Sequence, residues 1–496
     1  MARLSLTFVL MASLVAMPGC TTNPATGKKD FTPFMSKSQE RAIGLSEHPK
    51  LLKEFGGPYE DAAAGYVAQV GGTMARNSEL AGDPFTFTLL NSRIVNAFAL
   101  PGGYVYISRQ LLALMNDEAE LASVLGHEVG HVTGRHAAKR YNQQIFGGIL
   151  GLGVGVLTGS GDLARAVGQG VQMYTLAYSR DQEFQADELG VRYLGRAGYD
   201  PHAAADMLSS LGAESALEAK VMGREAAEKV PTWARTHPLT GDRVARAGKL
   251  AAASGAVPGA GTRNRDRFLS AIDGLLVDDD PAQGFINGRV FEHPVLKMRF
   301  TVPERYVMEN GDSALVAQGP NGAGLLFSGG QVGAGERLEA HIARVWQQLT
   351  QGQAAALPAA RARQVNGIEA AVTGTRLRNS QGGGVDVTIA AYRWTPTQAY
   401  HFVTITPTEM SGQLDAGLNA TLNSLRRLSD AEAAALKERR IKVVTVAAGQ
   451  TAQQLAERMA YDSHRLERFL TLNALDRPEQ LKAGQKAKLV VYDKRR

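Results

Sequence analysis

The sequence predicts a multidomain α+β protein, and three observations support this fold class. The chain has 496 residues, which exceeds the size at which one hydrophobic core stops growing, so two to four domains are expected. Helical periodicity dominates up to about residue 252, whereas strand-like alternation with two helices follows at 286–428, and residues 436–496 show a strand–helix–helix–strand pattern. Apolar residues make up 44% and charged residues 21% of the chain, which excludes a disordered or fibrous protein.

Residues 1–19 have the pattern of a signal peptide. An apolar run of 14 residues from Leu4 to Met17 is too short to span a bilayer as a helix. It leads into a Pro-Gly-Cys sequence whose cysteine, Cys20, is the only one in the chain, which excludes an internal disulfide. This ending resembles the lipobox of bacterial lipoproteins. The resemblance implies lipidation at Cys20, a tether at residues 20–35 and a location on the periplasmic side of the outer membrane; the alternative is a plain secretory signal with a chance cysteine.

Three histidines fall within ten residues in the segment NDEAELASVLGHEVGHVTGRH. Asp117 followed by Glu120 predicts a capping box that opens a helix. His127 and His131 are four residues apart, so they share one helix face at about 5–6 Å between Cβ atoms, and one metal ion can bridge them. Glu128 can reach a water molecule at such a metal without being a ligand. The alternative is a buried pair of structural histidines.

A catalytic zinc site needs a third protein ligand and an open fourth position. The segment SRDQEFQADELGVRYLG predicts a second helix, on which Glu183 and Asp187 are four residues apart and share a face. Glu183 can bind zinc, and Asp187 can accept a hydrogen bond from the free nitrogen of a ligand histidine, which fixes the orientation of that ring. Taken alone, this segment is equally explained by an acidic, solvated helix face.

The segments HEVGHVTGRH, YSRDQEFQAD and RTHPLTGDR together resemble metallopeptidase family forty-eight, the family of HtpX, the CAAX prenyl protease and the beta-barrel assembly-enhancing protease. The resemblance covers about half of the chain. It implies a metallopeptidase domain at 36–252 with a mainly helical zincin fold of the gluzincin type and a small edge-strand sheet. It also implies one Zn²⁺ ion per chain, with His127, His131 and Glu183 as metal ligands and Glu128 as the general base.

Two further segments resemble this family. In NAFALPGGYVYISRQLL, an edge strand would pair with the substrate backbone by β-augmentation. The candidate residues are Ala97, Phe98, Ala99 and Leu100, and an ordinary core strand is the alternative. In RTHPLTGDRV, the resemblance brings His237 to the metal, as a resting ligand or as a stabiliser of the oxyanion, whereas a surface turn histidine is the alternative. His136 is five residues past His131 and is expected to point away from the ligand face, so it is interpreted as structural.

The rest of the chain carries no catalytic cluster that the sequence reveals. The apolar, glycine-rich segment 145–157 is predicted to be a mobile flap, a segment that leans on the membrane or a buried helical hairpin. Residues 253–285 are predicted to be a linker from their composition. Residues 286–428 are predicted to form an α+β sandwich of unknown role.

The C-terminal segment 436–496 resembles a LysM domain, a βααβ module that binds N-acetylglucosamine glycans such as peptidoglycan. The matching segments are VTVAAGQT, LNAL and LKAGQKAKLVV, whereas Gln450 replaces the usual Asp of the first turn and the usual closing proline is missing. Residues 431–496 hold 14 Lys and Arg against 8 Asp and Glu, which accounts for the whole formal charge of +6. An exported lipoprotein does not meet nucleic acid, so this basic tail is expected to face anionic lipid or peptidoglycan.

These features together predict a zinc-dependent endopeptidase of the bacterial envelope. Its expected substrates are polypeptides, namely misfolded or stalled envelope proteins, and a chaperone activity is compatible with this role. The alternative is a lipoprotein that tethers the membrane to peptidoglycan and has a vestigial metal site. The intact Glu128 favours the enzyme, because it is the residue that hydrolysis needs in addition to the metal ligands.

Overall fold

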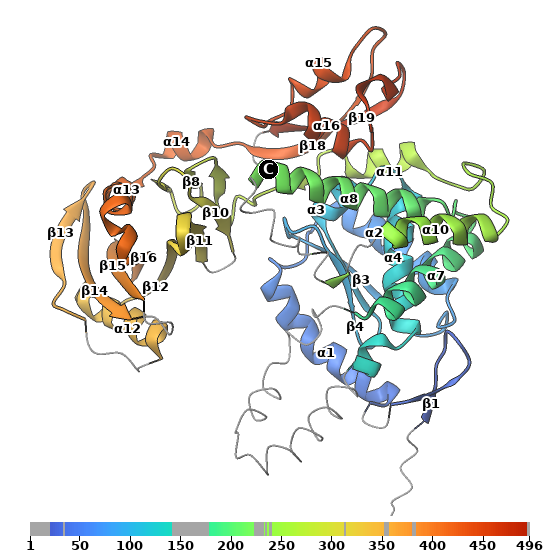
Figure 1. Cartoon of the computed structure of the whole chain (residues 1–496), viewed down its shortest axis with the longest axis horizontal. Helices are drawn as coiled ribbons and strands as arrows, with labels where there is room; N and C mark the ends of the chain where they lie inside the picture. The colour runs from blue at the N-terminus through green and yellow to red at the C-terminus, as the bar shows by residue number, and fades with distance from the viewer. Residues whose placement is uncertain are drawn as a thin grey trace, which may run out of the picture.

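The computed structural model describes residues 20–32, 35–140, 178–222, 233, 236–237, 241–311, 314–351, 357–378 and 383–493. The predicted signal peptide at 1–19 and the glycine-rich segment 145–157 lie outside the described residues. A helical part, a sheet-rich part and a small C-terminal module are seen in Figure 1, which confirms the mixed α+β class. Among the helices described, none has the length and apolar character needed to cross a bilayer.

The helical part surrounds a three-stranded sheet. The strands lie in the order β3 (Thr86–Leu90), β5 (Tyr104–Ser108) and β4 (Ala97–Leu100); β3 and β5 are parallel, and β4 is antiparallel to β5. Side chains on one sheet face join the main core, and those on the other pack against the first helix through Leu51. The helices are α1 (Lys37–Glu54), α2 (Ala62–Arg76), α3 (Arg109–Leu114), α4 (Glu118–Thr133), α7 (Arg180–Arg196), α8 (Ala203–Met222) and α10 (Gly241–Ala253).

Helix α4 begins almost as its sequence predicts. The Asp117 side chain accepts a hydrogen bond from the Glu120 backbone N–H at 2.9 Å, as an N-cap residue does. The Glu120 carboxylate accepts from the backbone N–H of Asn116 at 2.8 Å, one residue before the cap. The Glu120 side chain therefore accepts from the residue before the N-cap and not from the N-cap itself, as a capping box would require. Both contacts still stabilise the start of α4.

The predicted tether at 20–35 includes a hairpin that packs on the protein. Strands β1 (Cys20–Thr22) and β2 (Lys29–Phe31) pair antiparallel. The buried Asn23 donates to the carbonyl of Gly134 at 3.2 Å, directly after α4. This contact fixes the segment to the end of α4, which a freely extended tether would not provide; lipidation of Cys20 stays a prediction.

Residues 285–427 form a layered sheet structure with a helix on each face, as an α+β sandwich requires. The seven-stranded sheet has the order β10-β11-β12-β16-β15-β14-β13, and the four-stranded sheet has the order β17-β9-β8-β7. One hydrophobic cluster lies under α12 (Leu338–Thr350), and a separate one lies under α13 (Ser411–Ser424). The strands are β7 (Phe285–Asn287), β8 (Val290–His293), β9 (Met298–Thr301), β10 (Val307–Asn310), β11 (Ala314–Gln318), β12 (Gly324–Gln331), β13 (Arg361–Val365), β14 (Ile368–Arg378), β15 (Gly384–Thr395), β16 (Gln398–Pro407) and β17 (Arg426–Arg427).

The prediction of a linker at 253–285 needs correction. This range contains α11 (Arg265–Ile272) and β6 (Leu276–Val277), and β6 pairs antiparallel with the first strand of the C-terminal module. Composition misled here because the Gly- and Ala-rich residues before Arg265 do form an irregular connection. The apolar residues that follow are buried in the core of the helical part.

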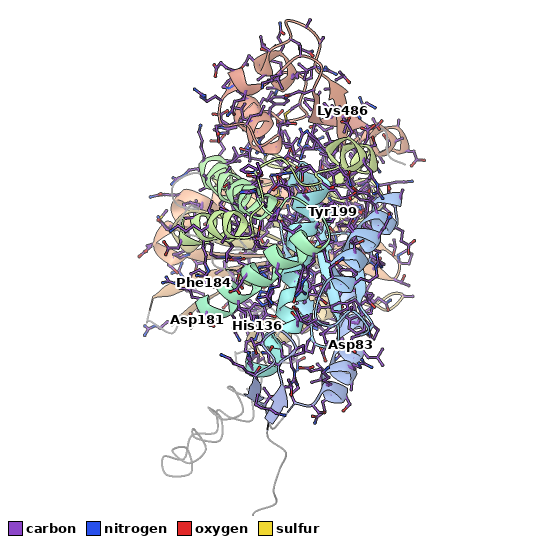
Figure 2. All side chains as sticks on the ribbon, turned by 90° about the vertical axis from the view of Figure 1, so that its right-hand side faces the viewer. Asp83, His136, Asp181, Phe184, Tyr199 and Lys486 are labelled. Carbon is purple, nitrogen blue, oxygen red and sulfur yellow. The ribbon has the colours of Figure 1, made fainter. Side chains whose placement is uncertain are left out.

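The C-terminal module has the expected strand–helix–helix–strand order. After α14 (Asp430–Ala435), the elements are β18 (Glu438–Thr445), α15 (Ala452–Ala456), α16 (Arg465–Leu472) and β19 (Lys486–Asp493), and the two strands pair antiparallel. Figures 1 and 2 show the module on top of the helical part, with Lys486 marking it in the second view. Its apolar side chains, including Ile441 and Leu489, belong to the same hydrophobic cluster as those of α2 and α4. The module and the helical part therefore share one core.

Candidate metal centre

Small residues bring the two predicted metal-binding helices into close contact. A Cβ atom on Gly190 of α7 would lie 3.1 Å from the backbone nitrogen of His127 on α4. A Cβ atom on Gly130 of α4 would lie 3.1 Å from the carbonyl oxygen of Ala186 on α7. Both distances are tighter than ordinary van der Waals contact, so the helix axes approach only because these positions lack side chains. This approach places Glu183 against the histidines of α4.

Four side chains converge on one point. His127, His131, Glu183 and His237 each offer one ligand atom, and these atoms all lie within 4.8 Å of one another. The Nε2 atoms of His127 and His131 are 3.0 Å apart, and His237 Nδ1 is 3.0 Å from Glu183 Oε1. Tetrahedral zinc with ligand bonds of about 2.0–2.1 Å separates its ligand atoms by about 3.3 Å. The cluster therefore has the spacing and the donor types that one zinc ion requires.

Two buried polar atoms, one in the cluster and one beside it, also indicate a site for an ion. Glu128 Oε2 and His237 Nε2 are both buried and have no hydrogen-bond partner among the described residues. Such atoms are costly unless a ligand, an ion or water satisfies them. His237 Nε2 lies 3.6 Å from Glu128 Oε1, so both groups face the same small space.

Asp187 and Arg243 contact the side chains of the metal cluster and fix their positions. Asp187 Oδ1 is 3.0 Å from Nδ1 of His127, which is the contact that the sequence predicts for an orienting carboxylate. Arg243 donates to both oxygens of Asp187 at 2.8 and 2.7 Å, and its Nη1 lies 2.8 Å from Glu183 Oε2. One guanidinium thus fixes two carboxylates of α7. Helical spacing does not predict the contacts of Arg243, because this residue lies on α10, far along the chain from both helices.

The expectation that His136 points away from the ligand face needs correction, although its role as a structural residue fits its contacts. His136 Nδ1 is 2.8 Å from Nδ1 of His131, and its Nε2 is 2.9 Å from Oε1 of Gln185 on α7. Helical periodicity does not apply to this residue, because α4 ends at Thr133 and the chain turns back through Arg135 at a φ of 54°. His136 therefore orients the His131 ring and leaves its Nε2 for the cluster.

Burial and neighbouring charges shift the pKa values of these groups. Burial raises the pKa of Glu128, which His237 and His127 partly oppose. Burial also raises the pKa of Glu183, but the surrounding histidines lower it more, so its pKa lies well below the ordinary value. Burial lowers the pKa of His131 well below its usual range. An ionised Glu183 and a neutral His131 are the forms that bind a metal.

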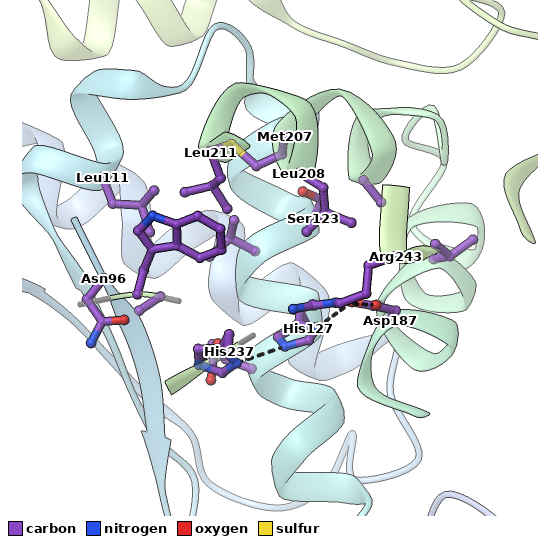
Figure 3. Close-up of a pocket in the computed structure, with 17 residues that line it drawn as sticks. Asn96, Leu111, Ser123, His127, Asp187, Met207, Leu208, Leu211, His237 and Arg243 are labelled. Carbon is purple, nitrogen blue, oxygen red and sulfur yellow. Dashed lines mark hydrogen bonds and ion pairs between the residues drawn. The ribbon is translucent and has the colours of Figure 1, made fainter. Parts of the chain in front are cut away.

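The predicted substrate strand lies at an edge of the sheet, next to the cluster. Strand β4, which comprises Ala97, Phe98, Ala99 and Leu100, pairs with β5 and has no second strand partner among the described residues. Ala97 lines a cavity together with His127, Glu128 and His237 (Figure 3). An extended peptide that paired with β4 would therefore run past the cluster.

Comparison with known proteins agrees with this geometry. Residues 61–251 match the profile of "Peptidase family M48". This part of the chain is similar to peptidase family M48. The match confirms the predictions of a metallopeptidase and of zinc as its cofactor, since M48 metallopeptidases use zinc and the four-residue cluster fits one ion.

Several named proteins are similar to this chain. A beta-barrel assembly-enhancing protease from Yersinia pestis is 30% identical over 43% of this chain and 44% of its own length. The protein of the same name from Escherichia coli K12 is 30% identical over 37% of each chain. The mitochondrial metalloendopeptidase OMA1 of Arabidopsis thaliana is 36% identical over 28% of each chain. The matches span less than half the length of these relatives.

Proposed function

We propose that this chain is a zinc-dependent endopeptidase of the bacterial envelope, which hydrolyses peptide bonds in misfolded or stalled envelope proteins. The observation that carries the proposal is the buried Glu128 carboxylate beside a four-residue cluster fit for zinc, since its Oε2 has no hydrogen-bond partner in the described part of the chain. A carboxylate in that position has the role of a general base.

The proposed roles follow from the contacts. His127, His131 and Glu183 hold the metal, with Asp187 and His136 orienting the two imidazole rings. Zinc in such a site lowers the pKa of water to about 7 and polarises a carbonyl group.

In the reaction, Glu128 takes the proton of the attacking water and passes it to the leaving amine. His237 Nε2 lies 3.6 Å from Glu128 Oε1, and His237 would act either as a resting metal ligand or as a donor to the oxyanion during the reaction.

The envelope setting rests on the relatives and on the N-terminal sequence. Two of the similar proteins are named for enhancing the assembly of beta-barrel proteins, and we extend to this chain a substrate class of envelope proteins that have failed to fold. Cys20 is the proposed lipidation site, which would place the protein on the periplasmic side of the outer membrane. Glycan binding by the LysM-like residues 436–496 is a further part of the proposal.

Replacement of Glu128 by Gln tests the activity. Zinc should remain bound at one ion per chain, and cleavage of unfolded casein should fall roughly 100- to 10,000-fold, because Gln cannot accept the proton. Crosslinking of the inactive variant in cells should trap unprocessed envelope proteins. Glu292→Gln is the matched control, because Glu292 is a buried carboxylate in the sandwich and should leave cleavage unchanged. Zinc binding without cleavage by the wild type would instead favour the tethering lipoprotein with a vestigial metal site.

A further inference from the structure

An apolar cavity opens beside the metal cluster (Figure 3). It holds about 610 Å³ when it is measured out to open solvent. His127 and His237 lie at one end of it, and Met207, Leu208 and Leu211 of α8 lie at the other. The indole of the buried Trp233 forms another part of the lining. None of these four apolar residues has a role in the proposed hydrolysis.

Away from the metal cluster and Glu128, the hydroxyl and charged groups that touch the cavity already have partners. The Ser123 hydroxyl donates to the carbonyl of Glu120 at 2.7 Å. Asp187 and Arg243 bind each other through two hydrogen bonds. Within the described part of the chain, the lining away from Glu128 and the histidines therefore holds no charge that is available to an ionic side chain entering the cavity. An ionised guest would lose its hydration without compensation, whereas an apolar guest would gain from burial.

The cavity also lies where a substrate side chain would arrive. Ala97 of the edge strand β4 and the general base Glu128 both line it. Side chains of an extended peptide alternate between its two faces, so a peptide paired with β4 directs one residue toward the cavity while its carbonyl group lies at the cluster. The cavity is thus adjacent to both the binding strand and the reacting atoms.

We propose that this cavity is the specificity pocket of the enzyme, and that it takes a large apolar side chain, such as that of Leu, Met or Phe, from a residue directly flanking the scissile bond. This inference rests on the proposed peptidase function. It assigns Leu211 as a specificity-determining residue, since its side chain helps to close the end of the pocket far from the metal. A protease with this pocket recognises segments that folded proteins bury, which suits substrates that have failed to fold.

Cleavage-site profiling tests the pocket. The zinc-loaded full chain and its Leu211→Phe and Leu211→Ala variants are each incubated with denatured proteins, and the products are sequenced by mass spectrometry. The wild type should prefer Leu, Met or Phe over Asp, Glu, Lys and Arg by at least about tenfold at one flanking position. Leu211→Phe should move that preference toward Ala and Val, and Leu211→Ala should move it toward Phe and Trp.

Leu217→Ala is the matched control. Leu217 lies on the same helix and is 8% exposed, as Leu211 is, but it does not line the cavity. This variant should lose stability without any change in preference. A second measurement needs no variant: a peptide hydroxamate with a leucyl side chain should inhibit the wild type roughly 10- to 100-fold more strongly than its aspartyl counterpart.

The outcomes separate the pocket from the peptidase function. Cleavage without apolar preference at either flanking position, or equal inhibition by the two hydroxamates, overturns the pocket and leaves the peptidase intact. A preference that stays the same in correctly folded Leu211 variants overturns the assignment of Leu211. Absence of cleavage by the zinc-loaded wild type overturns the proposed function itself.

Discussion

Lys488 joins the C-terminal module to the end of α3, just before α4 with its proposed metal ligands, and its replacement by Met should destabilise both the module and α4. The side chain is 0% exposed, and its Nζ donates to the carbonyls of Ala113 and Leu114 at 2.8 and 3.1 Å and also to that of Met115. These carbonyls end α3, where the helix leaves its last acceptors without internal partners. Three acceptors converge on one ammonium group just before α4 begins.

The expected loss is about 3 kcal/mol. Methionine keeps most of the length of the side chain, so the main effect is that three buried carbonyls lose their donor, at about 1 kcal/mol or more each. Burial lowers the pKa of Lys488 and the nearby Glu120 raises it, so the variant regains part of the cost of burying the charge. At about 2–4 °C per kcal/mol for a domain of this size, Tm should fall by roughly 6–12 °C.

Calorimetry of the zinc-loaded full chain measures this shift. Hydrogen exchange of a peptide that covers residues 113–120 then identifies the transition to which α4 belongs. Lys482→Met is the control, because Lys482 is exposed on the same module and should change stability by less than about 0.5 kcal/mol. If Lys488→Met unfolds within about 2 °C of this control, or if exchange at 113–120 is unaltered, the module does not support α4.

Three further variants test other contacts. Arg243→Lys keeps the charge but loses the paired hydrogen bonds to the helix α7 carboxylates, so zinc affinity measured against a competing chelator should fall roughly 10- to 100-fold. Gly130→Ala would force α4 away from Ala186, and zinc content after dialysis should drop. Burial raises the pKa of Glu214 from 4.5 to about 7, with Glu218 adding to the effect, so Glu214 removes stability as pH rises through this range. The Tm difference between Glu214→Gln and the wild type should therefore be more positive at pH 8 than at pH 5.

Local helix geometry explains why much of the metal centre could be predicted from the sequence. A four-residue spacing fixes which side chains share a helix face, so the pairs on α4 and α7 followed directly from their positions. The contacts of His136 and Arg243 with the cluster could not be predicted in this way. His136 reaches the cluster after a left-handed turn, and Arg243 reaches it from a third helix. Periodicity carries no information about such contacts, which tertiary packing alone creates.

The same reasoning explains why the C-terminal module was predicted to be a separate domain. Its strand–helix–helix–strand pattern is complete in itself, and the alternation in KAKLVV places Lys486 and Lys488 on the face opposite Leu489, as if both lysines faced water. In the structure the helical part covers that face at Lys488, which is fully buried. A lysine at an alternating strand position can face water or be buried, and only the packing of a distant segment determines which of the two occurs.

The shared core changes what the C-terminal module can do on its own. Independently folded domains are joined by exposed linkers, and few contacts cross the boundary between them. Here β18 pairs with β6, and Ile441 and Leu489 are buried in the same cluster as the side chains of α4. Separation of residues 436–496 from the rest would expose that apolar surface. It would also remove the Lys488 ammonium group that donates to the carbonyls at the end of α3. The module is therefore best understood as a structural part of the peptidase, and any glycan it binds would be held at a fixed position relative to the metal centre.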